Sequence, residues 1–304
     1  MPIKVKRSVS DHKGVIGGSQ IGATLGISKY QSVHDVWMSF MGMQKEVSEA
    51  QQEIFDMGHE LEDFIAKQVE RIFGVKVRRS NFAYVHPEAD WLICHPDRII
   101  TGKTEDGKVI GLEIKSSSSY DNARWGEADT DNIPADYLCQ CHSYIMTGVC
   151  DEVWLVRFSN NRITRYVIKK DEALEADILK KLTKVVEEWK EGVEPPIEDF
   201  EEAKKYYTRD TSGDIEATKE LIEVVNEWET LKKESKELEA RIDAKKAIIV
   251  SFMKDKSTLV DNLGNKLATY SKITSERFDS KSFKKDHPEM YSKYSKESSY
   301  MKLV

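Results

Sequence analysis

The chain has 304 residues, of which 39% are hydrophobic and 33% are charged, so it can bury one large core or two smaller ones. Its net charge of −7 argues against indiscriminate nucleic-acid binding, although an enzyme can still gather positive charge in one DNA channel. No apolar run approaches the roughly 18 residues of a membrane span. Residues 1–4 do not begin a signal peptide, so we expect no membrane partner.

The cysteine pattern indicates a reducing compartment. The chain has four cysteines, Cys94, Cys139, Cys141 and Cys150, and no two of them have Cys-x-x-Cys spacing. We therefore expect reduced thiols in a cytoplasmic protein. We expect no disulfide framework, zinc site or iron–sulfur site from this spacing.

A glycine-rich loop is the first informative segment. Residues 14–22 have the sequence GVIGGSQIG, which predicts exposed backbone N–H groups ahead of a short helix at residues 20–25. Ser19 is a candidate N-cap, and a loop-to-helix junction of this kind can bind a phosphate. An ordinary capped turn has the same pattern, so this segment alone leaves both interpretations open.

Helical periodicity predicts two helices in the next stretch. The first spans residues 32–41, and the second spans residues 48–73 and stops at Gly74, a residue type that commonly follows a helix. The apolar stripe expected on the second helix consists of Ile54, Met57, Leu61, Ile65 and Ile72. Glu62 lies just off this stripe, and taken alone it fits a solvated surface charge. Gly58, one turn earlier, would let another group approach the helix closely.

Short strands separated by turns occupy the chain between residues 75 and 115. We expect strands at residues 75–78, 81–86, 91–94, 98–101 and 109–115. The last two would form a hairpin across the turn-rich residues 102–108. Asp97 would then lie just before the fourth strand and close to Glu113 on the fifth. A turn aspartate with no further role is the alternative.

The strand at residues 109–115 carries two opposite charges on one face. Apolar Leu112 and Ile114 alternate with Glu113 and Lys115, so the carboxylate and the ammonium point together to the side opposite the apolar pair. They could form an exposed ion pair, which contributes little to stability. Alternatively, they could hold a divalent metal and a water beside a reacting phosphate. Glu-x-Lys alone favours the ion pair, and only the flanking motifs reverse that preference.

Proline and glycine delimit a further helix at residues 134–148, the expected asymmetry of helix ends. Gln140 and Tyr144 stand four residues apart within it and therefore share a face. Two strands and an amphipathic helix are expected next, at residues 153–158, 162–168 and 171–191.

The clearest boundary is Pro195-Pro196, which divides the chain into expected domains at residues 1–194 and 195–304. Beyond it, a heptad pattern predicts a long helix at residues 221–252 with a coiled-coil-like seam. The apolar seam positions are Leu221, Val224, Trp228, Leu231, Leu238, Ile242, Ile249 and Phe252, with Ser235 and Lys245 as interruptions. A hairpin at residues 258–260 and 267–270 and a tail rich in lysine, serine and tyrosine would follow.

We expect this seam to be buried, because an exposed apolar stripe of that length favours aggregation. It could fold back on residues 1–194, pack against a neighbouring subunit, or bind a partner protein. Under each alternative, residues 195–304 would serve assembly or DNA handling and contribute no catalytic group.

Five motifs occur in a fixed order along residues 14–156. They are residues 16–21 (IGGSQI), 57–62 (MGHELE), 95–97 (HPD), 111–115 (GLEIK) and 133–137 (IPADY) with Gln140. Together they resemble the PD-(D/E)xK nuclease superfamily and, within it, the YqaJ-type viral recombinases, relatives of the phage lambda exonuclease. The resemblance implies an α/β (α+β) fold of the restriction-endonuclease type, with a central mixed sheet flanked by helices and a helical C-terminal appendage.

The resemblance also implies an activity and the residues that carry it. The activity is Mg²⁺-dependent exonuclease digestion of linear double-stranded DNA, 5′→3′, which leaves single-stranded overhangs for recombination; Mn²⁺ is expected to substitute. The implied catalytic residues are Asp97, Glu113, Lys115 and Gln140. The implied metal ligands are Glu62, Asp97, Glu113 and the carbonyl of Ile114. The implied DNA or phosphate contacts are Ser19, Lys13, Gln140 and Tyr144.

Individual roles follow from the same resemblance. Lys115 would position or activate the attacking water, Gln140 would support Lys115 or the nucleotide, and Ser19 would contact the terminal phosphate. The family often has an arginine ahead of the glycine-rich loop to bind a 5′ phosphate. This chain has His12 and Lys13 there, and Lys13 is the candidate.

The family resemblance further implies a homo-oligomer, a trimeric ring in related proteins, that acts on DNA ends beside a single-strand annealing protein in the bacterial host cytoplasm. A structure-specific endonuclease or a non-catalytic DNA-binding or adaptor protein of the same fold is the alternative. A non-catalytic relative would be expected to lack Asp97, Glu113 or Lys115, and all three are present. An adaptor built around the C-terminal helix would leave the ordered motifs to coincidence.

Overall fold

The computed structural model describes residues 2–5, 13–43, 49–101, 107–117, 119–197, 199–207, 213–296 and 303. The chain forms two compact units, Met1–Asp199 and Phe200–Val304, which we describe separately. The boundary expected after residue 194 falls inside the first unit. Glu194 is tied to that unit because its Oε1 lies 2.9 Å from His34 Nε2. His12 and residues 102–106 lie outside the described residues.

A five-stranded mixed sheet forms the centre of the first unit. Its order is β3 (Lys76–Arg79), β6 (Arg98–Thr101), β7 (Ile110–Ser116), β8 (Glu152–Ser159) and β9 (Arg162–Lys169). Neighbouring strands run antiparallel except β7 and β8, which are parallel. A parallel pair requires a long crossover, and the segment between β7 and β8 contains α4 (Ala135–Met146). The expected central mixed sheet is confirmed.

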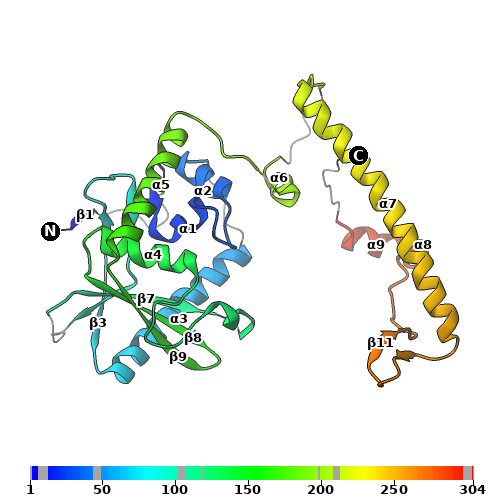
Figure 1. Ribbon diagram of the computed structural model, residues 1–304, viewed down its shortest axis with the longest axis horizontal. Coiled ribbons are helices and arrows are strands. Elements are labelled where there is room, and N and C mark those ends of the chain that lie inside the picture. Colours follow the sequence, from blue (N-terminus) through cyan, green and yellow to red (C-terminus); the bar gives the residue numbers. More distant parts are fainter. Residues whose placement is uncertain are drawn as a thin grey trace. The chain divides into compact units, whose positions relative to one another are not determined.

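Helices α3 (Glu49–Phe73) and α4 cover opposite faces of this sheet (Figure 1). The apolar residues of β7, which include Leu112 and Ile114, pack with Ile65 and Val69 of α3. The intervening residues of β7 face α4, where Glu113 meets helix side chains. The alternation predicted for this strand is therefore confirmed, and it assigns the apolar residues to one helix and the charges to the other.

A second, four-stranded sheet has the order β1 (Ile3–Val5), β4 (Ala83–Val85), β5 (Leu92–Cys94) and β2 (Ile16–Gly17). The pairing of β2 with β5 anchors the start of the glycine-rich loop. The loop then continues as η1 (Gly18–Gln20) and α1 (Ile21–Thr24). Helices α2 (Val33–Phe40) and α5 (Glu172–Lys190) pack with α1 around a core that contains Trp37, Phe40 and Trp189.

The apolar stripe expected along α3 is wrong in its outer parts. Ile65 is fully buried, but Ile54, Met57 and Ile72 are 68%, 65% and 48% exposed. The helix is 25 residues long, and the buried positions gather where it crosses the sheet, at Ile65, Ala66 and Val69. Periodicity predicts which face of a helix is apolar, but it does not say how far the neighbouring core extends.

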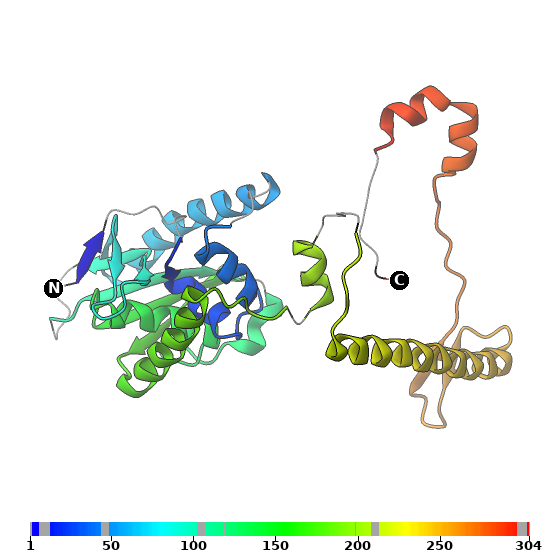
Figure 2. The same ribbon diagram turned by 90° about the horizontal axis from the view of Figure 1, so that it is seen from above.

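The second unit contains the predicted long helix and hairpin. Its elements are α6 (Phe200–Tyr206), α7 (Lys219–Met253), β10 (Thr258–Val260), β11 (Lys266–Thr269), α8 (Ser280–Asp286) and α9 (Pro288–Tyr294). Figure 2 shows α7 as one uninterrupted helix. Within this unit the seam residues other than Trp228 are exposed, and Met253 is the buried residue of α7. The expected burial of the seam against another surface stays a prediction. None of the described helices is long and apolar enough to cross a membrane.

Candidate active site

The hairpin of β6 and β7 brings Asp97 against the strand that carries Glu113. Arg98, the first residue of β6, pairs with Leu112 of β7, so Asp97 lies level with the next part of β7. There the Asp97 Oδ2 atom accepts the backbone N–H of Ile114 at 2.8 Å. This hydrogen bond fixes the turn before β6 to the centre of the sheet and holds the Asp97 carboxylate beside Glu113.

Glu113 is buried, with 2% of its surface exposed, and three donors hold its two oxygens. Lys115 Nζ lies 2.7 Å from Oε1, and Gln140 Nε2 donates to the same oxygen at 2.7 Å. The Tyr144 hydroxyl donates to Oε2 and accepts a hydrogen bond from Gln140 Nε2 at 2.9 Å. A buried carboxylate is costly unless donors and an opposite charge surround it, and these side chains supply both.

Glu62 approaches the same group from α3. Its side chain is 26% exposed, and Oε2 lies 3.9 Å from the guanidinium of Arg98. Burial raises the pKa of Glu62 and the charge of Glu113 raises it further, while His59, Arg98 and Lys115 oppose the shift. The Glu62 carboxylate is therefore part of the local charge cluster, and a solvated surface charge does not describe it.

Electrostatics divide the cluster into an acidic set and one firmly charged lysine. Burial raises the pKa of Asp97 well above its usual range, and the charges of Glu113 and Glu62 add to that effect. Burial lowers the pKa of Lys115, but Glu113 and Asp97 outweigh it, and the pKa rises to about 12. Lys115 thus carries its proton throughout the neutral range.

This donor set fits a divalent cation. In the described part of the chain, no three His, Cys, Asp or Glu side chains converge closely enough to form a ready metal cage. However, α3, the turn before β6, and β7 each contribute one carboxylate. Burial, and to a smaller extent the neighbouring negative charges, raise the pKa of Asp97 and of Glu62. Carboxylate oxygens are the ligands that Mg²⁺ prefers, and a cation among them would offset their negative charge.

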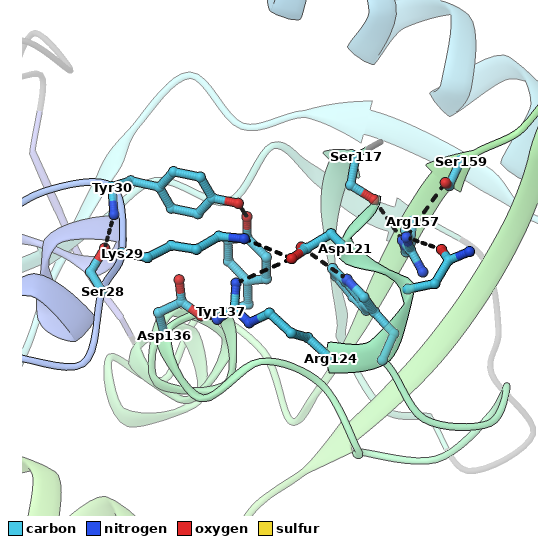
Figure 3. A network of polar contacts seen from close by, with 12 residues as sticks. Ser28, Lys29, Tyr30, Ser117, Asp121, Arg124, Asp136, Tyr137, Arg157 and Ser159 are labelled. Atoms are coloured by element: carbon cyan, nitrogen blue, oxygen red, sulfur yellow. Dashed lines mark hydrogen bonds and ion pairs between the residues drawn. The ribbon is translucent and has the colours of Figure 1, made fainter. Parts of the chain in front are cut away.

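A polar network next to the site joins segments far apart in the sequence (Figure 3). Its side-chain links join Lys29 to Asp121, Arg124 to Asp136, and Tyr137 to Tyr30. These links hold residues 28–30, which follow the glycine-rich loop, near η2 (Ser119–Arg124) and the start of α4. The Lys115 ammonium lies 5.2 Å from the centre of the Tyr137 ring, so the network borders the charge cluster.

Sequence reasoning missed Arg157, as it missed the network around Lys29 and Asp121. Arg157 pairs in register with Lys115 across the parallel strands β7 and β8. Its guanidinium donates to Ser117 Oγ and Asn122 Oδ1, both at 2.6 Å, and lies 4.7 Å from the centre of the Trp125 ring (Figure 3). Arg157 therefore fixes the chain that leaves the end of β7. A basic residue inside an apolar strand was the available signal.

Of the four predicted DNA or phosphate contacts, Gln140 and Tyr144 bind Glu113, whereas Ser19 and Lys13 do not. The hydrogen-bond and ion-pair partners of Glu113 among the described residues do not include Ser19 or Lys13. Ser19 is exposed in η1, and it does not form the N-cap that we predicted for it. The α-helix α1 begins at Ile21, one residue later than expected, so its N-cap residue is Gln20. The Gln20 Oε1 atom accepts the Gly17 N–H at 2.9 Å.

Gly18 is required where η1 touches α4. A Cβ atom at this position would lie 2.4 Å from Ser143 Oγ, which donates to the carbonyl of Gln140 at 2.6 Å. We expect Gly18→Ala to lower the free energy of unfolding by roughly 1–3 kcal/mol through overpacking, measured by urea denaturation. Gly58→Ala is the control. Its Cβ meets open space, so this variant should be unchanged or stabilised by about 0.5–1 kcal/mol through helix propensity. Equal stabilities of the two variants would contradict this.

Comparison with known proteins adds independent observations. Over 302 residues, the chain is 29% identical to the uncharacterized protein YqaJ of Bacillus subtilis (strain 168), covering 95% of this chain and 90% of that protein. A crystal structure of LHK-Exo in complex with dAMP is 17% identical, with a TM-score of 0.48 over 61% of this chain and 92% of the other. The alkaline exonuclease LHK-Exo from Laribacter hongkongensis is 15% identical, with a TM-score of 0.45 over 60% and 91%.

The family model of the YqaJ-like viral recombinase domain matches residues 9–150. This range contains the glycine-rich loop, α3, the β6–β7 hairpin and α4. It therefore includes every side chain of the cluster around Glu113, which consists of Glu62, Asp97, Glu113, Lys115, Gln140 and Tyr144. Over residues 9–150, the chain is therefore similar to the YqaJ-like viral recombinase domain.

Proposed function

We propose that this chain is a metal-dependent deoxyribonuclease that degrades linear double-stranded DNA from its ends, with Mg²⁺ as cofactor and Mn²⁺ as a substitute. One observation carries the proposal. Buried Glu113 contacts the ammonium of Lys115, and two further carboxylates, Asp97 and Glu62, have pKa values raised by burial and, to a smaller extent, by the charge of Glu113. A fold gains no stability from gathering repelling carboxylates, so a cluster of this kind is more readily explained by a bound cation.

Glu62, Asp97, Glu113 and the carbonyl of Ile114 would hold the cation. When bound, a divalent cation polarises a phosphate and lowers the pKa of a bound water, which is the chemistry that phosphodiester hydrolysis requires. The chain's contribution would be to fix the carboxylates. The Ile114 N–H holds Asp97, and α4 holds Glu113.

Lys115 would act as a fixed positive charge. In the metal-free protein the charges of Glu113 and Asp97 outweigh burial and raise its pKa to about 12, so the ammonium keeps its proton at neutral pH. The family resemblance implies that Lys115 either positions the attacking water or activates it by removing a proton. The charged ammonium favours the first role, in which it positions the water and stabilises charge on the phosphate.

We assign Gln140 and Tyr144 to positioning rather than to DNA contact. Both are buried, with 7% and 1% of their surfaces exposed, and both donate to Glu113. Burial and the charges of Glu113 and Asp97 raise the pKa of Tyr144 well above its usual range, so its hydroxyl remains a donor. Contacts to a terminal 5′ phosphate would fall instead to exposed groups near the glycine-rich loop, Ser19 and Lys13. Digestion from the 5′ end is proposed on this basis.

A comparison of DNA forms tests the activity. Linear duplex, nicked circle, covalently closed circle and single strand would each be incubated with Mg²⁺, with EDTA as the control. We expect the linear duplex to be shortened in Mg²⁺ only and the closed circle to persist. Cleavage of the closed circle would indicate an endonuclease. Folded protein that leaves every form intact in Mg²⁺ and Mn²⁺ would contradict the proposal.

A stability measurement tests the cation site without relying on turnover. The raised pKa of Asp97 means that the folded protein keeps this proton to higher pH than the unfolded chain, whose aspartates titrate near pH 4. The contribution of Asp97 to the stability of the metal-free protein should therefore fall as pH rises above about 4. Asp97→Asn removes the charge and keeps an acceptor for the Ile114 N–H, so it should raise the metal-free Tm at pH 8.

The same variant should lose most of the Tm increase that Mg²⁺ gives the wild-type protein. Thermal denaturation between pH 5 and pH 9, with EDTA or with Mg²⁺, measures both effects. A variant that is less stable than wild type in EDTA at pH 8, yet gains as much from Mg²⁺, would show that Asp97 is structural and does not bind the cation.

We also propose that residues 200–304 contribute no catalytic group and serve assembly, DNA handling or binding of a single-strand annealing protein. A chain truncated after Asp199 retains the whole first unit. We expect it to cleave short duplexes in Mg²⁺ and to lose processivity, oligomerisation or partner binding, measured by gel assay and light scattering. A folded, Mg²⁺-binding truncated chain that is inert on short duplexes would contradict this division.

A further inference from the structure

Helix α7 presents an apolar seam to solvent along its length. Its exposed seam residues range from 39% exposed at Ile249 to 75% at Phe252 and comprise Leu221, Val224, Leu231, Leu238, Ile242, Ile249 and Phe252. The helix has 35 residues and a capped N-terminus, where the Thr218 hydroxyl accepts the Leu221 N–H at 3.2 Å. A helix of about 50 Å with such a stripe requires a covering partner.

We propose that α7 pairs with α7 of a second copy of this chain in an antiparallel two-helix coiled coil. When one helix is reversed, the apolar positions meet along the whole seam. Leu221 faces Phe252 of the second copy, Val224 faces Ile249, and Leu231 faces Ile242; symmetry repeats each pair. This inference does not depend on the proposed nuclease activity.

The two interruptions of the seam are also accommodated. Ser235 faces Leu238 of the second copy near the centre, where a small residue leaves room for a large one. Lys245 faces Trp228, and an ammonium over an indole ring is favourable. The single chain already contains a contact of this type, because Lys232 Nζ lies 4.2 Å from the centre of the Trp228 ring.

Charges beside the seam select the antiparallel direction. In this register Lys232 faces Glu239 of the second copy and Glu234 faces Arg241, so symmetry gives four attractive pairs. Lys232 also pairs with Glu229 of its own helix at 3.0 Å, but both are exposed, and such a pair contributes little.

The parallel arrangement has the opposite balance. In the same heptad frame, Glu234 would face Glu239 of the second copy, and Arg241 would face Lys246. The attractive contact that remains is Glu227 with Lys232. Since charges at these flanking positions determine the orientation of paired helices, the sequence of α7 favours the antiparallel pair and opposes the parallel one.

Charge reversal in the full-length chain distinguishes the two directions. Glu239→Lys places an ammonium against Lys232 in the antiparallel pair, but against Glu234 in the parallel pair. We expect this variant to weaken self-association about tenfold, measured by sedimentation equilibrium. Glu237→Lys makes the same chemical change on the outward face of α7 and should leave association unchanged. Stronger association of Glu239→Lys would overturn the proposal in favour of a parallel pair.

A mixing experiment adds a second, independent criterion. Lys232→Glu should also self-associate weakly, because the introduced carboxylate then faces Glu239 of the second copy. When Lys232→Glu and Glu239→Lys chains are mixed, the facing positions are again opposite in charge, so mixed pairs should form at wild-type affinity. Failure of the mixture to associate, while circular dichroism shows both variants folded, would overturn the antiparallel register.

A distance measurement excludes association through the first unit alone. A spin label at Asn226→Cys lies on the outer face of α7, and the four native cysteines are buried. In the antiparallel pair, residue 226 lies level with residue 247 of the second copy. The two labels are then about 32 Å apart along the axis at about 1.5 Å per residue. Labels at the same level would indicate a parallel pair. If no distance between the two labels is detected, another surface covers the seam. That result and the parallel result each overturn the proposal.

Discussion

Replacing Glu113 with glutamine is expected to lower DNA cleavage by on the order of a thousandfold or more, with the fold retained. The reason is the geometry of its three partners. Lys115 and Gln140 both approach Oε1, and Tyr144 donates to Oε2. A glutamine has one acceptor oxygen, so its amide group must face a donor, and the charge that would attract a cation is lost.

Cleavage rates under single-turnover conditions, together with circular dichroism, measure this effect. Glu172→Gln is a matched control, because it makes the same chemical change at a carboxylate whose side chain is 82% exposed at the start of α5. The control should cleave at the wild-type rate. If folded Glu113→Gln protein retained near-normal turnover, the proposed mechanism would have to be abandoned.

Replacing Lys115 with methionine should lower turnover by about a hundred- to a thousandfold, since it removes a charge that would act on the phosphate. Methionine keeps much of the apolar stem beside Tyr137. Because the ammonium would not be a metal ligand, calorimetry should show Mg²⁺ binding largely retained. In the metal-free protein, the raised pKa of Lys115 means that its positive charge persists across the neutral range.

Loss of Mg²⁺ binding in Lys115→Met would show that Lys115 organises the carboxylates rather than acting on the substrate. Lys29→Met serves as a comparison, because that lysine also forms a short ion pair, at 2.6 Å to Asp121, but outside the carboxylate cluster. It should weaken the local network and leave the rate of the chemical step within about tenfold of wild type.

The cluster around Glu113 could be predicted because it depends on local periodicity. Alternation on β7 places Glu113 and Lys115 on one face, and spacing of four on α4 gives Gln140 and Tyr144 a common face. A short turn before β6 leaves Asp97 little freedom. Each of these relations extends over a few residues, so the sequence defines it before the tertiary structure is known.

Contacts between distant segments could not be predicted in the same way. The Lys29–Asp121 pair joins residues 92 positions apart, and neither residue has a local pattern that identifies its partner. The same limit explains Glu62. Its position beside an apolar stripe fits a surface charge, so the local pattern does not identify it. The family resemblance implies it as a metal ligand, and the packing of α3 on the sheet brings it near Glu113.

The start of the glycine-rich loop illustrates a different limit. Serine before a short helix is a common N-cap. Here, however, the Gln20 side chain accepts the Gly17 N–H, and the helix begins one residue later than expected. On α7, by contrast, the heptad pattern predicts the long helix correctly, while burial of its seam depends on a surface outside the helix. The expected burial stays a prediction, because a heptad pattern describes a pair of helices rather than one.

The most direct test of the proposed DNA hydrolysis uses a linear duplex labelled at one 5′ end or at one 3′ end and sampled over time with Mg²⁺. We expect the 5′ label to be released early as a mononucleotide, while the 3′ label remains in long strands and EDTA prevents release of both. Folded protein that releases neither label in Mg²⁺ would contradict the assignment of the Glu113 cluster to DNA hydrolysis. Early release of the 3′ label would contradict the proposed polarity.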